Sequence, residues 1–412
     1  MPDPTREVAF DLLTAVLDRR RPLEDALEAL PPAAPRDRAA GHRLAAAVLR
    51  RLGTLDAVLE PLLRKAPPIP VRHILRLGTA GLLLLGTPDH AAVATSVALA
   101  RQRGLTPFAG LVNAVLRRVA ERGPAALDGL DGPRLDTPAW LWASWGKLAR
   151  PIAMAHQSPA PLDLTLRPTA EPPPGGETLP TGSIRFPPGT HVVELPSYES
   201  GVWWVQDAAA ALPARLLAAR RDERAADLCA APGGKTAQLA AAGAKVVAVE
   251  RDRARLERLR NNLARCRLTA ETIEADALTW RAPAPFDAVL LDAPCTATGT
   301  IRRHPDIPHL KRPRDVAAMT ETQDRLLAAA AEMLRPGGRL VYAVCSLQPE
   351  EGAARIEAAL ARGDLRHAPF TPEELADLPQ ARTPEGYLRT HPALWPERGG
   401  MDGFFAARLV KV

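Results

Sequence analysis

From about residue 220 onward, short apolar runs alternate with charged helical segments, and this pattern restricts the possible folds of the 412-residue chain more than any other feature. Helical patterns separate five apolar runs, which lie at 224–228, 245–249, 271–275, 286–291 and 339–344. The fourth run is apolar almost throughout, which is typical of a parallel strand buried on both faces. Alternation of this length predicts a doubly wound parallel sheet, so we expect an α/β Rossmann-like domain over residues 216–412.

The first third of the chain, residues 1–135, shows helical periodicity instead. Val8, Leu12 and Val16 recur at the spacing of one buried helix face. Further apolar helical segments follow, and proline or glycine interrupts the chain between them. Several short helices joined by short loops predict an all-α helical bundle.

Residues 136–215 differ from both neighbours, because nine prolines fall between Pro159 and Pro188. Apolar runs at 162–166 and 191–195 are candidate strands. This composition fits either a small α+β extension or a linker with little order. The chain is therefore expected to be multidomain, with this segment between a helical bundle and an α/β domain.

Charge and cysteine content exclude several classes of protein. The chain has 53 Lys and Arg against 47 Asp and Glu, a net charge of +6, which permits nucleic-acid binding without showing it. No run of about 18 apolar residues is present, and acidic residues interrupt the N-terminus where a signal peptide would lie. Four cysteines without a C-x-x-C pair predict neither a disulfide framework nor a structural zinc site. We therefore expect a cytoplasmic protein with free thiols, no membrane span and no metal.

The turn after the first run of the α/β region, Asp227–Thr236, has the composition of a ligand-binding loop. It lies at the edge of the sheet where such folds bind ligands. Its adjacent glycines let backbone N–H groups approach a ligand closely. The turn matches neither the dinucleotide pattern G-x-G-x-x-G nor the phosphate-binding pattern G-x-x-x-x-G-K-[ST], so a phosphate-cradling loop is disfavoured.

Acidic residues follow the second and third runs. Glu250 lies 23 residues after Asp227, where a carboxylate accepts hydrogen bonds from ribose hydroxyls. Asp276 follows the third run and is expected to face an adenine. A nucleoside cofactor without a pyrophosphate fits S-adenosylmethionine better than NAD. The alternative is an ordinary tight turn with a solvated glutamate.

Two cysteines follow neighbouring strands of the expected sheet. Cys295 ends the sequence Asp292-Ala293-Pro294-Cys295 after the fourth run, and Cys345 closes the fifth. Because the carboxyl ends of parallel strands meet at one edge, both thiols are expected beside the cofactor crevice. A single cysteine is usually a small buried hydrophobe, as we expect for Cys229 and Cys266, but two at neighbouring strand ends favour a catalytic pair.

Methylation of cytosine at C5 is a reaction that uses such a pair. C5 is too weak a nucleophile to attack a methyl sulfonium, and addition of a thiolate to C6 makes C5 nucleophilic. After methyl transfer the C5 proton leaves and the thiol is expelled, a step that a second cysteine assists. Asp292 is placed to hydrogen-bond the protonated ring nitrogen or the exocyclic amine of the base.

Several motifs resemble those of the RsmB/Nop2/Sun family of RNA 5-methylcytosine methyltransferases. They are the turn Asp227–Thr236, the motif Asp292–Cys295, and Cys345-Ser346 followed by Pro349-Glu350-Glu351. The string 292–306 and the run Gly399–Phe405 resemble the bacterial RsmB branch, which modifies 16S ribosomal RNA. The resemblance extends to a NusB-type helical RNA-binding domain, carried by residues 73–85, 88–93 and 111–117.

The resemblance implies a role for each candidate site residue. Cys345 is the nucleophile that adds to C6, Cys295 resolves the covalent adduct, and Asp292 is a third catalytic residue. The implied partner is 16S ribosomal RNA, bound by a monomer, with no DNA and no membrane. The residues implied to bind S-adenosylmethionine are Cys229, Ala230, Ala231, Pro232, Gly233, Gly234, Lys235, Glu250, Asp276 and Asp292.

Two positions depart from the family pattern. Val344 stands where many members have threonine, and Gly352 stands where many have asparagine. Neither change removes a catalytic thiol, so we expect activity to survive.

Two basic regions are candidates for RNA contact. Residues 301–315 carry five Arg and Lys against two Asp, a composition that suits phosphate contacts and equally a solvated loop. Phosphate contacts there would lie close to the target base, which must leave its stack to enter the crevice. The helical domain would present a basic face, or simply a soluble one, through Arg6, Arg36, Arg38, Arg43, Arg50 and Arg51.

Three other functions remain open at this point. The same chemistry on transfer RNA or another RNA is one, although the NusB-like domain disfavours it. A DNA cytosine methyltransferase would use Cys295 as its nucleophile and would not need Cys345. A binding protein that resembles an antitermination factor, with a decayed enzyme domain, would not need the paired cysteines or the cofactor turn.

Overall fold

The computed structural model describes residues 3–412 and divides the chain into two compact units. The first unit consists of the residues up to 158 together with 301–312. The second consists of 159–300 and 313–412. The chain therefore leaves the second unit after Thr300 and re-enters it at Pro313.

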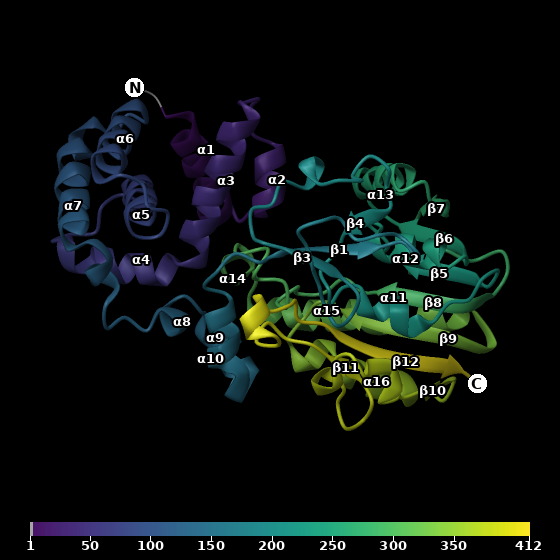
Figure 1. The fold of residues 1–412 in the computed structure, drawn as a ribbon. Coiled ribbons are helices and arrows are strands. Elements are labelled where there is room, and N and C mark those ends of the chain that lie inside the picture. Colours follow the sequence, from purple (N-terminus) through teal and green to yellow (C-terminus); the bar gives the residue numbers. More distant parts are fainter. Residues whose placement is uncertain (1–2) are drawn as a thin grey trace. The chain divides into compact units, whose positions relative to one another are not determined.

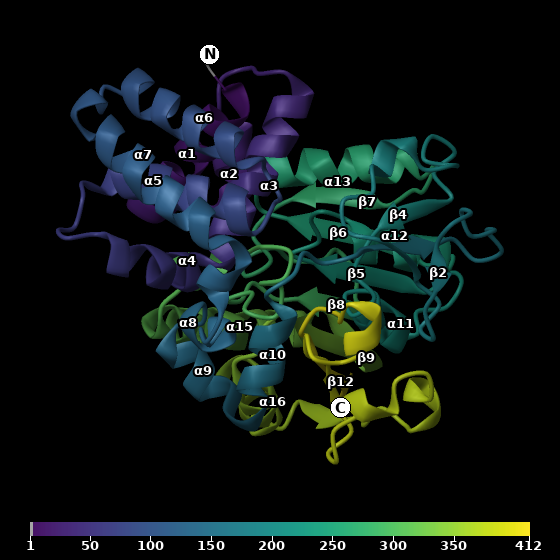
Figure 2. The ribbon, with the colours of Figure 1, turned by 60° about the vertical axis from the view of Figure 1, so that its left-hand side comes forward.

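The first unit is helical, as expected, and α5 is its central helix. Ten residues of α5 are buried, because it contacts α1, α3, α4, α6 and α7 (Figures 1 and 2). Proline in the first turn begins several of these helices, where its missing N–H has no intrahelical partner to lose. The helices are α1 Pro4–Leu13, α2 Leu23–Glu28, α3 Pro35–Arg50, α4 Leu52–Leu59, α5 Ile69–Leu83, α6 Asp89–Gln102, α7 Ala109–Arg122, α8 Gly132–Leu135, α9 Ala139–Trp145, α10 Ala149–Ala155 and α14 Ile307–Leu310.

This helical unit extends beyond the expected boundary at residue 135. Asp136, the first residue of the expected linker, accepts hydrogen bonds from Thr54 N and Thr54 Oγ1, both at 2.7 Å, and from Arg51 Nε at 3.0 Å. Two further helices follow, α9 and α10, and their inward faces are buried. The change in the chain comes at Pro159, where the proline-rich stretch begins.

The residues between 159 and 205 form a small antiparallel sheet with strand order β2-β3-β1-β4. Its strands are β1 Leu162–Leu166, β2 Glu177–Thr178, β3 Ile184–Phe186 and β4 Trp203–Val205. The expected strand at 162–166 is confirmed, but the one at 191–195 is wrong. Val192–Glu194 is a single turn of 3₁₀-helix, because Pro196 and the glycine turn before it leave no extended partner in the sheet.

The large sheet is doubly wound, as expected. Its strand order is β10-β12-β9-β8-β5-β6-β7, with β11 paired to β12, and Figure 1 shows it from β7 at the top to β10 at the bottom. The pairs from β9 to β7 are parallel, whereas β12 runs antiparallel to β9. The strands are β5 Arg224–Leu228, β6 Lys245–Glu250, β7 Glu271–Glu274, β8 Phe286–Asp292, β9 Leu334–Val344, β10 Leu365–His367, β11 Leu388–Arg389 and β12 Phe405–Lys411.

Helices cover both faces of this sheet, which explains why the central strand β8 is apolar almost throughout. Along β8, Val289 and Leu291 pack toward one face, whereas Ala288 and Leu290 pack toward the other. The first face carries α15 Pro313–Glu332 and α16 Ala353–Leu360. The second carries α11 Leu212–Leu217, α12 Gly234–Ala241 and α13 Arg253–Arg265.

The chain order reverses between β5 and β8, and this reversal marks the ligand edge. From β5 the chain continues outward through β6 to β7, and it then returns to β8 on the other side of β5. In open α/β sheets, ligands bind in the crevice at the carboxyl ends of the strands beside such a reversal. The carboxyl ends of β5, β6 and β8 carry Asp227, Glu250 and Asp292.

The described part of the chain, residues 3–412, holds no helix with the length and apolar character that a bilayer crossing requires. Nor does any group of three or more His, Cys, Asp and Glu within these residues gather where it would hold a metal ion. All four cysteines are free thiols.

Candidate active site

The turn between β5 and α12 is shaped by two residues in the left-handed region of the backbone. Cys229 has φ 61° and Gly233 has φ 100°. A Cβ on Gly233 would lie 2.9 Å from Cγ of Leu259, so glycine is needed there for space as well as for conformation. Thr236 Oγ1 donates to Asp227 Oδ2 at 2.6 Å and ties the start of α12 to the end of β5.

Asp227 is fully buried at the centre of this edge. Its second carboxylate oxygen, Oδ1, has no hydrogen-bond partner. Burial raises the pKa of Asp227 to about 7, with the charges of Asp292 and Glu250 adding to the effect and Thr236 and Lys235 opposing it. Because one oxygen of Asp227 lacks a hydrogen-bond partner and its pKa is raised, a ligand that brings a hydrogen-bond donor or a positive charge would stabilise the ionised form of Asp227.

Glu250 is buried at the end of β6 and faces the same turn. It accepts hydrogen bonds from Ala231 N at 3.3 Å and Asp252 N at 3.1 Å, and Arg255 lies 3.4 Å away. Asp276 lies two residues beyond β7, where its carboxylate accepts from Leu278 N at 2.9 Å. Both acidic residues therefore stand at the strand ends where the sequence placed them.

Asp292 at the end of β8 forms an ion pair with Lys235 from α12. Lys235 Nζ lies 2.7 Å from Asp292 Oδ2 and 5.1 Å from the centre of the Phe404 ring. Burial lowers the pKa of Lys235, but the charge of Asp292, its hydrogen bond to Lys235 and the charge of Asp227 together raise it above its usual value. Lys235 therefore stays charged in its pair with Asp292.

The two cysteines that follow β8 and β9 lie side by side. Their Sγ atoms are 3.5 Å apart, within hydrogen-bonding distance for sulfur, and both residues are half-buried. Parallel pairing of β8 with β9, in which Asp292 is opposite Ala343, brings their carboxyl ends to the same edge. A hydrogen bond with Cys345, together with burial, raises the pKa of Cys295 well above its usual value.

The other two cysteines have different surroundings. Cys229 lies in the cofactor turn, and burial raises the pKa of its thiol to about 12, so it stays protonated. Cys266 ends α13 and is buried. Neither thiol is within hydrogen-bonding distance of another sulfur in the described structure.

Glu351 is a buried carboxylate behind the cysteine pair, and its motif in the sequence does not indicate a role for it. Glu351 is fully buried and accepts hydrogen bonds from residues next to both cysteines, Thr296 and Ser346. The sequence feature that points to Glu351 is its position, six residues after Cys345 in the sequence Pro349-Glu350-Glu351. Composition alone cannot separate this buried glutamate from the exposed Glu350 before it.

The two departures from the family pattern lie close to this pair. Val344 is fully buried in the last position of β9. Gly352 packs against the Phe405 ring, and a Cβ there would lie 3.2 Å from two ring atoms. A larger side chain at 352 would therefore require that the ring or the backbone move.

The basic segment expected to hold phosphates is partly a core element of the helical unit. Arg302 is 1% exposed, so it cannot reach RNA. Leu23 N donates to Asp306 Oδ2 at 2.9 Å, and His309 Nε2 lies 2.8 Å from the carbonyl oxygen of Leu49. Of the basic residues in 301–315, the exposed ones are Arg303, Arg312 and Arg314.

The helical unit exposes fewer of the arginines expected to form its basic face than their number suggests. Arg6 is buried and donates to Ser96 Oγ, Arg38 donates to the carbonyl oxygen of Leu27, and Arg51 pairs with Asp136. Burial lowers the pKa of Arg50 to about 10. The arginines of that group that remain exposed are Arg36 and Arg43.

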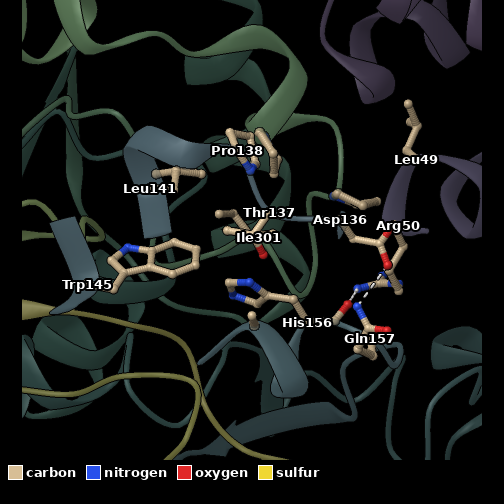
Figure 3. Close-up of a pocket in the computed structure, with 13 residues that line it drawn as sticks. Leu49, Arg50, Asp136, Thr137, Pro138, Leu141, Trp145, His156, Gln157 and Ile301 are labelled. Atoms are coloured by element: carbon tan, nitrogen blue, oxygen red, sulfur yellow. Dashed lines mark hydrogen bonds between the residues drawn. The ribbon is translucent and has the colours of Figure 1, made fainter. Parts of the chain in front are cut away.

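A cavity of about 20 Å³ lies within the helical unit, between α9, α10 and the inserted segment 301–312. Figure 3 shows the rings of Trp145 and His156 at this cavity together with Ile301. Arg50 Nη1 donates to the carbonyl oxygen of His156 at 3.1 Å. This volume suits a single water molecule and excludes a nucleotide.

The doubly wound sheet, the glycine turn beside its chain reversal and the acidic strand ends define an α/β methyltransferase. The chain belongs to the family described as 16S rRNA methyltransferase RsmB/F, whose family model matches residues 214–410. The model of the NusB family matches residues 3–121. The resemblance inferred from the motifs is confirmed, and membership makes the chain a methyltransferase enzyme.

Curated relatives match almost the whole chain. Ribosomal RNA small subunit methyltransferase B of Sodalis glossinidius is 35% identical and covers 98% of this chain and 97% of its own length. The protein of the same name from Thermus thermophilus is 38% identical and covers 92% and 89%.

Solved structures share the fold. The structure of PH0851 covers 100% of this chain and 99% of its own, with a TM-score of 0.75 and 21% identity, which is a likeness of fold alone. A methyltransferase homologue from Pyrococcus horikoshii covers 69% and 96%, with a TM-score of 0.55 and 26% identity.

Proposed function

We propose that this enzyme transfers a methyl group from S-adenosylmethionine to C5 of a cytosine in 16S ribosomal RNA through a covalent adduct between Cys345 and C6. The observation that carries the proposal is the 3.5 Å separation of the Cys295 and Cys345 sulfurs. Two thiols this close, at the carboxyl edge of a methyltransferase sheet, suit a reaction that both forms and breaks a carbon–sulfur bond.

The residues at this edge fit S-adenosylmethionine by charge. Asp227, Glu250, Asp276 and Asp292 present carboxylates, against Lys235, which pairs with Asp292, and Arg255, which lies 3.4 Å from Glu250. A carboxylate edge favours a ligand with hydroxyl, ammonium and sulfonium groups and disfavours a pyrophosphate. When bound, this cofactor supplies a methyl group on a positively charged sulfur.

Within that frame Glu250 would accept hydrogen bonds from ribose hydroxyls, and the backbone of Cys229–Gly234 would line the cofactor. Asp276, at the end of the third parallel strand, would lie toward the adenine. Lys235 would act indirectly, because its ion pair at 2.7 Å fixes the carboxylate of Asp292 at the end of β8.

The two thiols take different roles in the reaction. The thiolate of Cys345 adds to C6, the electrons of the C5–C6 double bond become available at C5, and C5 accepts the methyl group. Transfer of the C5 proton to a water molecule then re-forms the double bond and breaks the bond from C6 to sulfur, with the electron pair returning to Cys345. Cys295, whose raised pKa keeps it protonated, hydrogen-bonds the departing thiolate.

Asp292 would hold the base during these steps. The Asp292 carboxylate, ionised in its pair with Lys235, would accept a hydrogen bond from the exocyclic amine or from a protonated ring nitrogen, whose positive charge favours addition of sulfur to C6. The Asp292 side chain is 29% exposed, so it remains accessible to a base that enters the crevice. A base reaches such a site only after it leaves its stack.

The substrate part of the proposal rests on the relatives. Those from Sodalis glossinidius and Thermus thermophilus carry the name ribosomal RNA small subunit methyltransferase B, and the NusB family match covers residues 3–121 of the helical unit. A 5-methylcytosine methyltransferase that acts on transfer RNA is the second candidate, and a methylation assay on separated RNA classes distinguishes the two.

The test replaces each cysteine separately. Cys345→Ala should reduce methylation by at least about 10⁴-fold, because no nucleophile remains. Cys295→Ala should accumulate a protein–RNA adduct that survives denaturation, measured on gels with labelled 16S RNA. Cys266→Ala, which removes a thiol outside the site, is the control. Adduct accumulation with Cys345→Ala instead would reverse the assignment.

A further inference from the structure

Two loops carry the catalytic cysteines, and a single buried side chain contacts both of them. Glu351 is fully buried, and its carboxylate accepts hydrogen bonds from the residue that follows each cysteine. Thr296 N donates to Oε1 at 2.9 Å and Thr296 Oγ1 donates to Oε2 at 2.5 Å. Ser346 Oγ also donates to Oε2.

A fourth donor completes the set. Gln323 Nε2, from α15, donates to Glu351 Oε1 at 3.1 Å and to the carbonyl oxygen of Pro294 at 3.0 Å. An ionised carboxylate has about four acceptor positions, two on each oxygen. Four donors therefore occupy all the acceptor positions of this carboxylate.

The hydrogen-bonding positions of the Ser346 hydroxyl, beside Cys345, are also fully occupied. Ser346 Oγ accepts from Gln348 N at 3.0 Å and lies 3.2 Å from Thr298 Oγ1, so its only proton points to Glu351. On the other side of this loop, Arg389 donates to the carbonyl oxygens of Ser346 at 2.8 Å and Leu347 at 2.5 Å. Glu351 is thus the acceptor around which both cysteine loops are arranged.

We infer that Glu351 is a positioning residue that sets the distance between Cys295 and Cys345 by holding Thr296 and Ser346 on one carboxylate. It touches neither sulfur through a hydrogen bond, and it acts on the reaction through the two loops. The consequence for catalysis rests on the proposed function, whereas the effect on the sulfur distance does not.

Replacing Glu351 with glutamine keeps the size of the side chain but changes its hydrogen bonding. This variant therefore separates the effect of the hydrogen bonds from the effect of side-chain volume. Glu351→Gln must point its oxygen toward Thr296 N and Gln323 Nε2, which can only donate. Its NH₂ group then faces the hydroxyls of Thr296 and Ser346 and cannot accept the hydrogen bonds that they donate. Nor can Ser346 accept a hydrogen bond from this group, because its acceptor positions are already occupied. Glu351→Gln is therefore expected to be impaired, and Glu351→Ala, which leaves four buried donors unsatisfied, more so.

The first measurement is steady-state methylation of 16S RNA by the full chain. Loss of alignment is expected to lower kcat by about 10²-fold for Glu351→Ala, with an intermediate loss for Glu351→Gln and KM for RNA unchanged. Glu350→Ala is the matched control, since Glu350 is exposed and should keep wild-type kcat. A rise in KM without loss of kcat would overturn the inference.

The second measurement reports the sulfur distance without any RNA. Diamide oxidises two neighbouring thiols to a disulfide by taking up their two hydrogens, and peptide mapping locates the bond. Wild-type protein and Glu350→Ala should form the Cys295–Cys345 bond rapidly, and Glu351→Gln and Glu351→Ala more slowly. Equal rates in all four proteins would refute the positioning role, even if the proposed reaction were correct.

If Glu351→Ala does not fold, Glu351→Gln and Ser346→Ala provide the same comparison. Failure of the proposed function has a different signature: wild-type protein would form the disulfide rapidly, yet no adduct would appear with Cys295→Ala.

Discussion

Residues 292–300 and 301–312 are consecutive in the chain, yet they belong to different compact units and are held by different means. The first segment lies in the methyltransferase unit, where hydrogen bonds to one buried carboxylate and to the loop after Cys345 hold it. The second lies in the helical unit, where it supplies part of the core and receives hydrogen bonds from Leu23 and Arg50.

The comparison shows that charge along the sequence is a poor guide to what a segment contacts. The segment 301–312 looks like a phosphate-binding loop by composition, but Arg302 is almost fully buried within the helical unit. The segment 292–300 has little charge, and it carries the cysteine and the aspartate of the site. Changes in residues 292–300 should alter catalysis, whereas changes around residues 301–312 should alter the stability of the helical unit.

The largest expected effect is on the catalytic side of this comparison. Gly299 N donates to the carbonyl oxygen of Cys345 at 3.0 Å, and a Cβ on Gly299 would lie 2.0 Å from the carbonyl oxygen of Gly403. Gly299→Ala must therefore move backbone beside Cys345, and we expect kcat to fall by about 10²-fold. Gly110→Ala, where the new Cβ meets nothing within 4 Å, is the control. Wild-type kcat for Gly299→Ala would contradict this account.

The next effect is on the stability of the helical unit. Arg50 donates to the carbonyl oxygens of His156 at 3.1 Å and Arg302 at 2.9 Å. Arg50→Ala leaves both buried carbonyls without this donor, which should lower the free energy of unfolding by about 2 to 3 kcal/mol. Urea denaturation measures the change, and Arg43→Ala, an exposed arginine two turns earlier on α3, should be neutral. Equal effects would show that the inserted segment is not held through Arg50.

The smallest expected effect is a pH dependence confined to the same region. Burial, together with the charges of Arg302 and Arg50, lowers the pKa of His156 to about 3, and its Nε2 has no hydrogen-bond partner. Between pH 6.5 and 3 the unfolded chain therefore binds a proton that the folded chain does not, so this group lowers stability as the pH falls.

At pH 5 the loss attributable to His156 should be about 2 kcal/mol relative to pH 7. His156→Gln, which cannot take up a proton, should lack this loss in denaturation experiments at the two pH values. His90→Gln, a change at an exposed histidine of α6, should leave the pH dependence intact. The idea is wrong if both variants behave like the wild type.

Some of the site was accessible from the sequence because it depends on strand ends. Asp227, Glu250, Asp292, Cys295 and Cys345 each follow an apolar run, and a parallel sheet brings such positions to one edge whatever the details of packing. The same rule predicts that the two sulfurs lie close together. Glu351 could not be found in this way, because nothing in its composition separates a buried carboxylate from an exposed one.

The amino-acid order by itself determined the helical and α/β parts of the chain, the cofactor turn and the two cysteines, since periodicity and strand ends are local properties. Only the tertiary structure decided that residues 301–312 belong to the helical unit, that Arg302 is buried and that one carboxylate joins two loops. These facts depend on contacts between residues far apart in sequence, and burial, which decides whether a charged side chain meets solvent or a partner, is a property of the packed molecule.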